Sequence, residues 1–185
     1  MAKRLVCVVE GKGEVEAVPV LCARIVFVHL GAPRSEWAVD ADPIRLPRSQ
    51  LVDERVARGA RPPRAEGLAR ASGLIRGRGA HAALVLVDSD GDCPASWGPA
   101  ARLSSGHSAV MAVREYEAWL LAGHSRVDDA DTVRNPKAVA AREWPGYRPT
   151  TRQAELTRSM DLSAAEQRSA SFRYLVRELR RLVGG

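Results

Sequence analysis

Lysine, aromatic residues and cysteine are all scarce in this chain of 185 residues. Aromatic residues make up 5% of it, so we expect a core built mainly from valine, leucine and alanine. The three cysteines are odd in number and show no Cys-x-x-Cys spacing, which argues against a disulfide framework and against a zinc site. Cys7 and Cys22 lie in apolar runs, and we interpret them as core residues.

No segment has the composition of a membrane span or of a secretory signal. The longest apolar-rich run, residues 15–30, contains Glu16, Arg24 and His29, whereas a transmembrane helix needs about 20 mainly apolar residues. Met1 is followed by Ala-Lys-Arg and then directly by an apolar strand, without the hydrophobic segment of a signal peptide. We therefore expect a cytoplasmic protein that does not bind membranes.

Arginine carries almost all of the positive charge. Three lysines stand against 25 arginines, and the net charge is +6. Guanidinium groups match phosphate oxygens through paired hydrogen bonds, so nucleic acid is a natural partner. The competing interpretation is compositional bias in an alanine- and arginine-rich chain, and charge alone does not separate the two.

Short apolar runs alternate with helical patterns along the chain. Strands are expected at residues 5–9, 37–40, 82–87 and 109–113. Helices are expected at residues 14–30, 66–76, 115–122 and 171–183. Residues 41–64, rich in proline and arginine, are expected to be irregular and exposed. The pattern predicts a single α/β domain with a mostly parallel, Rossmann-like sheet flanked by helices, in which about residues 1–125 form the core and about 126–185 a helical C-terminal extension.

Carboxylates follow three of the expected strands. Glu10 comes directly after the first strand, Asp88 and Asp90 after the central strand, and Glu115 after a later one. Because the carboxyl ends of parallel strands open at one edge of a sheet, we expect these side chains to converge. Converging carboxylates repel one another unless a cation neutralises them, and their oxygens suit Mg²⁺ or Mn²⁺. Two such ions can hold the attacking and leaving oxygens of a phosphodiester.

Taken alone, the Asp88-Ser89-Asp90 motif is not specific. The same pattern occurs in haloacid-dehalogenase phosphatases and in nucleotide-sugar transferases, and it also suits a solvated turn. Phosphotransfer through Asp88 as a nucleophile would require phosphatase-like helper residues, which we do not find. The combination of acidic residues at several strand ends is what favours a metal site.

Two further residues are candidates for catalysis. On a helix, Glu115 and Glu117 point about 200° apart and cannot both face one ion. Glu115 lies nearer the strand end and is the better candidate, whereas Glu117 is expected to pair with Arg114 or to cap the helix. Lys137 follows the helix-start pair Asn135-Pro136 and is a candidate to stabilise a negative transition state. The competing interpretation of Lys137 is a solvated helix lysine.

Three segments together resemble a bacterial domain-of-unknown-function family with a TOPRIM-like fold, related to the nuclease domains of overcoming-lysogenization-defect proteins. The segments are Val-Glu-Gly-Lys-Gly-Glu at 9–14, Leu-Val-Asp-Ser-Asp at 86–90 and Arg-Glu-Tyr-Glu-Ala-Trp-Leu-Leu at 114–121. Residues 135–139 and 171–173 also look like the family pattern, so the resemblance spans nearly the whole chain.

The resemblance implies a function and a ligand set. TOPRIM domains hold Mg²⁺ through a Glu after the first strand and an Asp-x-Asp after a later one, which here are Glu10, Asp88 and Asp90. In the nuclease branch a second acidic residue, matched by Glu14, helps to hold a second ion. Members of the family are often encoded beside an ABC-type ATPase in arrangements that look like anti-phage defence. Gly13 stands where the family usually has threonine, so a hydroxyl contact to phosphate is not expected.

We therefore hypothesise a Mg²⁺- or Mn²⁺-dependent nuclease that acts on nucleic acid, on DNA in preference to RNA, as the effector subunit of an ATPase–nuclease pair. The candidate catalytic residues are Glu10, Asp88, Asp90, Glu115 and Lys137. The candidate metal ligands are Glu10, Glu14, Asp88 and Asp90. The alternative hypothesis is a regulatory or partner-binding module that keeps the acidic pocket without turnover.

Overall fold

The central sheet is parallel throughout. The computed structural model describes residues 1–124 and 127–184, and within them five strands pair in the order β2-β1-β4-β5, with β3 also beside β1. The strands are β1 (Lys3–Val9), β2 (Trp37–Val39), β3 (Ile44–Arg45), β4 (Ala82–Asp88) and β5 (Ser108–Ala112). The predicted α/β fold with a mostly parallel sheet is confirmed.

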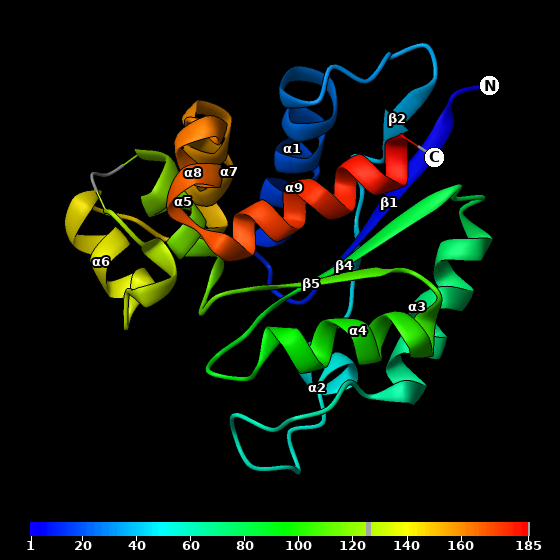
Figure 1. Ribbon diagram of the computed structural model, residues 1–185, viewed down its shortest axis with the longest axis horizontal. Helices are drawn as coiled ribbons and strands as arrows, with labels where there is room; N and C mark the ends of the chain where they lie inside the picture. The colour runs from blue at the N-terminus through cyan, green and yellow to red at the C-terminus, as the bar shows by residue number, and fades with distance from the viewer. Residues whose placement is uncertain (125–126, 185) are drawn as a thin grey trace.

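Helices cover both faces of this sheet (Figure 1). One face packs against α1 (Glu14–Arg24), its π-helical continuation η1 (Ile25–His29) and α9 (Ala170–Val183). The other face packs against α2 (Arg48–Leu51), α3 (Ala65–Gly77) and α4 (Pro94–Ser105). The remaining helices are α5 (Tyr116–His124), η2 (Ala130–Thr132), α6 (Pro136–Glu143), α7 (Pro149–Ser159) and α8 (Leu162–Arg168).

The two-residue repeat of the strands divides the core into two halves. In β4, Leu84 and Leu86 face the α1 and α9 side, whereas Val85 and Val87 face α3 and α4. Successive side chains of a strand point to opposite faces, so a strand buried on both sides is apolar at every position. This explains why the continuous apolar runs in the sequence predicted central strands.

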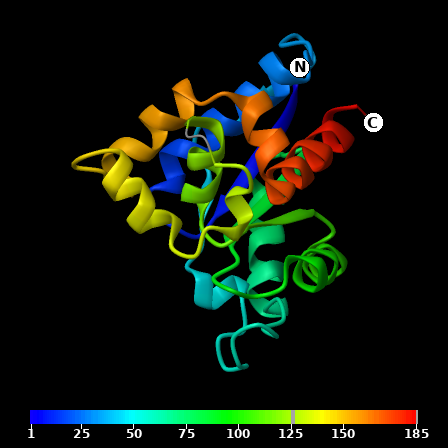
Figure 2. The same ribbon diagram turned by 60° about the vertical axis from the view of Figure 1, so that its left-hand side comes forward.

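The carboxyl ends of β1, β4 and β5 point toward α5–α8 (Figure 1). Figure 2 shows α6, α7 and α8 gathered on the side of α1, and α7 packs directly against α1. The last helix, α9, returns to pack against β5 and η1. The C-terminal helices therefore enclose one end of the sheet and supply part of its cover.

Two expectations from the sequence were wrong or incomplete. Helix α4 was not predicted, because Pro94, Gly98 and Pro99 have low helix propensity. Residues 41–64 are not irregular and exposed throughout, since they contain β3 and α2 and bury Leu51 and Val52 completely. In the part of the chain described, no helix is long and apolar enough to cross a membrane.

Candidate metal centre

Strand pairing brings Glu10 and Asp88 together. Val9 pairs with Leu86 in the parallel register of β1 and β4, so the strand ends lie side by side. The backbone N–H of Asp88 donates to Oε1 of Glu10 at 3.2 Å. The backbone N–H of Tyr116, which opens α5, donates to Oδ1 of Asp88 at 2.8 Å. Both carboxylates are thus oriented by main-chain groups from neighbouring elements.

Glu14 joins this pair from the first turn of α1. Its Oε2 accepts from the backbone N–H of Gly11 at 2.8 Å, and an acidic residue is also favoured at the positive end of a helix. Glu10, Glu14 and Asp88 each offer a carboxylate oxygen, and these three oxygens lie within 4.8 Å of one another. We call these three residues the carboxylate triad.

Burial and mutual repulsion raise the pKa values of the triad. Desolvation raises the pKa of Glu10 from 4.5 to about 7; the Arg48 guanidinium opposes this shift and the charge of Glu14 adds to it. Desolvation also raises the pKa of Glu14, and it raises the pKa of Asp88 well above its ordinary value, with the charges of Glu14 and Glu10 adding to the shift of Asp88. One buried and two half-buried carboxylates therefore meet with too little positive charge among the protein's own groups.

Glu117 lies beside the triad, contrary to the expectation that its helix would turn it away. It is 2% exposed, its Oε1 accepts from the hydroxyl of Tyr147 at 2.9 Å, and its charge raises the pKa values of Glu14 and Asp88. The expected pairing of Glu117 with Arg114 is absent among the described residues. Helical spacing does not relate Glu115 to Glu117, because Glu115 precedes α5, and α6, α7 and α8 pack around this helix.

Glu115 and Lys137 meet at the rim of the site. Oε2 of Glu115 accepts from the backbone N–H of Lys137 at 3.1 Å, and Glu115 is not part of the triad. The Lys137 side chain is exposed, and its charge lowers the pKa values of Glu14 and Glu117. The start of α6 therefore brings one positive charge toward the carboxylates.

Sequence reasoning missed Arg48, which lies against the triad from α2. Its Nη1 is 3.3 Å from Oε2 of Glu10 and also donates to the carbonyl of Asp88. Its Nη2 donates to Oδ2 of Asp92 at 2.9 Å. Only 13% of the side chain is exposed, so this ion-pair network is largely shielded from water. Nothing in the sequence distinguishes Arg48 from the other arginines of residues 41–64.

Asp90 points to this arginine and lies outside the triad. Its Oδ2 is 3.5 Å from Nε of Arg48, and its backbone has a φ of 49°, in the left-handed region that aspartate adopts more readily than most residues. Asp92, which sequence reasoning also missed, is fully shielded and accepts from the backbone N–H of Gly59 at 2.7 Å. The acidic loop after β4 is therefore divided: Asp88 faces the triad, and Asp90 and Asp92 share Arg48.

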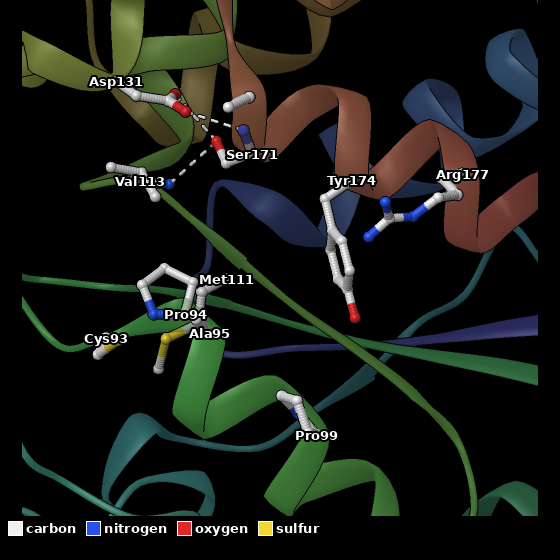
Figure 3. A pocket seen from close by; sticks show the side chains of 11 residues that line it. Cys93, Pro94, Ala95, Pro99, Met111, Val113, Asp131, Ser171, Tyr174 and Arg177 are labelled. Carbon is white, nitrogen blue, oxygen red and sulfur yellow. Dashed lines mark hydrogen bonds between the residues drawn. The ribbon is translucent and has the colours of Figure 1, made fainter.

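A hollow lies between α4 and α9, beside the carboxyl end of β5 (Figure 3). It has a volume of about 430 Å³ and is lined mainly by apolar side chains, including Met111 and Val113. Figure 3 shows the Tyr174 ring projecting into it from α9, and the guanidinium of Arg177 lies 4.8 Å from the centre of that ring. No residue of the triad lines this hollow.

No family model, curated protein or solved structure matches this chain. The geometry of the carboxylate triad and its surroundings is therefore the basis for assigning a function.

Proposed function

We propose that this protein is a divalent-metal-dependent phosphodiesterase that acts on nucleic acid, with one ion held by Glu10, Glu14 and Asp88. The observation that carries the proposal is the convergence of three carboxylate oxygens, from one buried and two half-buried residues, within 4.8 Å at the carboxyl edge of a parallel sheet. Ligand sites of open α/β sheets lie at this edge.

The donor set fits a hard cation. All three ligands are carboxylates, which suit Mg²⁺ and Mn²⁺, and the triad leaves coordination positions for water and substrate oxygens. The raised pKa values of Glu10, Glu14 and Asp88 mean that the ionised triad is costly without a cation. When bound, the ion would supply Lewis-acid charge at the phosphoryl group and at the attacking water.

The proposal assigns one ion to the site, in place of the two that the family resemblance implies. Asp90 and Asp92 both lie within ion-pair distance of Arg48, and Asp92 is also 3.8 Å from Nη1 of Arg61, so these two carboxylates have cationic partners in the protein itself. In this proposal Arg48 holds the loop after β4 in place, and Lys137 adds positive charge near the reacting phosphate. The backbone N–H of Tyr116 keeps Asp88 directed at the ion.

Metal binding is tested first. Mn²⁺ or Mg²⁺ at about a hundred times its dissociation constant should stabilise the parent by about 2.7 kcal/mol, or about 5–10 °C in Tm for a chain of this size. Asp88→Asn should lose this response, because it removes a ligand charge while retaining size. Glu36→Gln, which removes an exposed carboxylate far from the triad, is the matched control. Mn²⁺ titration followed by electron paramagnetic resonance should give one ion per chain.

Cleavage is tested on single- and double-stranded DNA and on RNA, with each metal, alone and with the product of any neighbouring ATPase gene. Asp88→Asn and Glu10→Gln should each lower the rate by at least about a hundredfold, because the missing charge stabilisation acts on the transition state. Cleavage by Asp88→Asn at the parent rate would assign the activity to another site. Metal binding without cleavage by the parent would favour the non-catalytic module.

A further inference from the structure

A second, polar hollow adjoins the carboxylate triad. It has a volume of about 280 Å³ and is formed by four loop segments that meet at the carboxyl edge of the sheet. Its lining residues are Arg58, Asp90, Gly91, Arg114, Glu115, Arg134 and Asn135. We call it the arginine hollow.

Main-chain contacts hold the walls of the arginine hollow together. The backbone N–H of Asp90 donates to the carbonyl of Arg114 at 2.9 Å, which joins the loop after β4 to the loop after β5. The segment that carries Arg58 is tied to the loop after β4 through the bond from Gly59 to Asp92. The bond from the Lys137 N–H to Glu115 fixes the turn that carries Arg134. The three arginines are therefore presented by segments anchored to one another.

The guanidinium groups of Arg58, Arg114 and Arg134 have no ion pair and no hydrogen bond within residues 1–124 and 127–184. The two carboxylates in the same wall are already engaged, Asp90 with Arg48 at 3.5 Å and Glu115 with the N–H of Lys137. Three exposed positive charges thus face a hollow whose negative charges have other partners. Such a site attracts an anion with several oxygens, because guanidinium forks match phosphate geometry.

The position of the hollow links it to the triad. Asp90 lies two residues after Asp88, and Glu115 immediately precedes Tyr116, whose N–H binds Asp88. The hollow therefore opens beside the same carboxylate that is proposed to hold the metal. Its volume equals that of roughly nine water molecules at about 30 Å³ each, which is room for a phosphate with part of its sugar.

The larger hollow in Figure 3 does not offer the same chemistry. It is mainly apolar, and its single arginine, Arg177, lies over the Tyr174 ring. The arginine hollow is thus the better site for an anion.

We propose that the arginine hollow binds a backbone phosphate of a nucleic-acid strand next to the phosphodiester at the carboxylate triad. This inference rests on the proposed function and adds to it the place where the strand is held. Recognition through phosphate is independent of base sequence. Binding should therefore be insensitive to sequence and steeply dependent on salt.

The test measures binding of a fluorescent single-stranded oligonucleotide as a function of salt, in EDTA so that the probe is not cleaved. Replacing Arg58, Arg114 and Arg134 together by alanine should weaken binding at every sequence tested. It should also reduce the slope of log K against log salt by about 0.7, the value for one phosphate of a single strand. Each single variant should weaken binding and reduce the slope by no more than this amount.

A second triple variant controls for the change in net charge. Arg76, Arg158 and Arg180 are exposed, lie on α3, α7 and α9, and do not line the arginine hollow. Their replacement by alanine removes the same charge and should leave the slope unchanged. Equal weakening by the two triple variants would overturn the proposal, as would an absence of oligonucleotide binding by the parent at low salt.

Two further measurements separate the possible outcomes. Competition by inorganic phosphate and by a nucleoside monophosphate distinguishes a strand site from a free-phosphate site; the proposal requires that the oligonucleotide bind more tightly than either. The Mn²⁺-induced rise in Tm should survive in the hollow variant, which shows that its fold and triad are intact. Arginine-dependent binding by a parent that cleaves nothing would refute the proposed function and leave the phosphate site standing.

Discussion

Replacing Glu10 by glutamine should make the stability of the metal-free protein less sensitive to pH. Below pH 4.5 Glu10 is protonated in both the folded and the unfolded chain, so its burial carries no charge penalty. Between pH 4.5 and 7 the unfolded chain loses this proton while the folded chain, whose Glu10 has a pKa of about 7, retains it. The unfolded state therefore gains stability as the pH rises, and the folded state is progressively disfavoured.

The expected size of this effect follows from the pKa difference. An increase from 4.5 to about 7 corresponds to about 3 kcal/mol at about 1.4 kcal/mol for each pH unit. Only 10% of the Glu10 side chain is exposed, so solvent screening reduces the figure little. The Glu10 charge also raises the pKa of Asp88, so its removal should weaken the remaining pH dependence as well.

Urea unfolding at pH 5 and at pH 8, with EDTA present, measures the effect. The parent should lose about 2.5 kcal/mol more than Glu10→Gln between these two values, because part of the titration of the unfolded chain lies below pH 5. Glu16→Gln removes an exposed carboxylate on α1 and should behave as the parent does. An identical pH dependence in the parent and in Glu10→Gln would refute the view that this carboxylate is buried at an energetic cost.

Two more predictions concern packing and thiol chemistry. A Cβ added to Gly13 would lie 2.4 Å from Oε1 of the buried Gln153, so Gly13→Ala should lower the free energy of unfolding, measured in urea, by about 1–3 kcal/mol. As a control, Gly73→Ala meets open space within α3 and should raise the free energy of unfolding by about 0.5–1 kcal/mol. Equal effects of the two changes would contradict the packing of α7 over the β1–α1 turn. Hydrogen bonds from the backbone and hydroxyl of Ser96 lower the pKa of the exposed Cys93 thiol, whereas Cys7 and Cys22 are buried. An aromatic disulfide reagent should therefore modify Cys93 rapidly in the folded protein and the other two thiols only on unfolding. Rapid reaction of more than one thiol would contradict the burial of Cys7 and Cys22.

The sequence was a good guide to the sheet and to part of the site. Continuous apolar runs identified β1 and β4, because a strand covered on both faces needs apolar residues at every position. The rule that parallel strands share a carboxyl edge then placed Glu10 and Asp88 near each other, whereas Glu14 was a candidate only through the family resemblance. These inferences depend on neighbours in sequence and on strand direction, both of which a local pattern contains.

Other parts of the site depended on elements far apart in the chain. Arg48 lies in a segment without periodicity, and its importance comes from carboxylates about 40 residues away that only the folded chain brings to it. Asp90 and Asp92 form ion pairs with Arg48 and therefore do not join the carboxylate triad.

The sequence alone thus indicated β1, β2, β4 and β5, their shared edge and acidic residues that end there, but not β3. Only the tertiary structure decided which carboxylates face one another. Helical spacing did not give the relative directions of Glu115 and Glu117, because α5 begins only at Tyr116, whose N–H donates to Asp88 on another strand. Glu117 is buried against Tyr147, which lies between α6 and α7. The residue at which this helix begins, and the groups that cover it, depend on segments distant in the sequence.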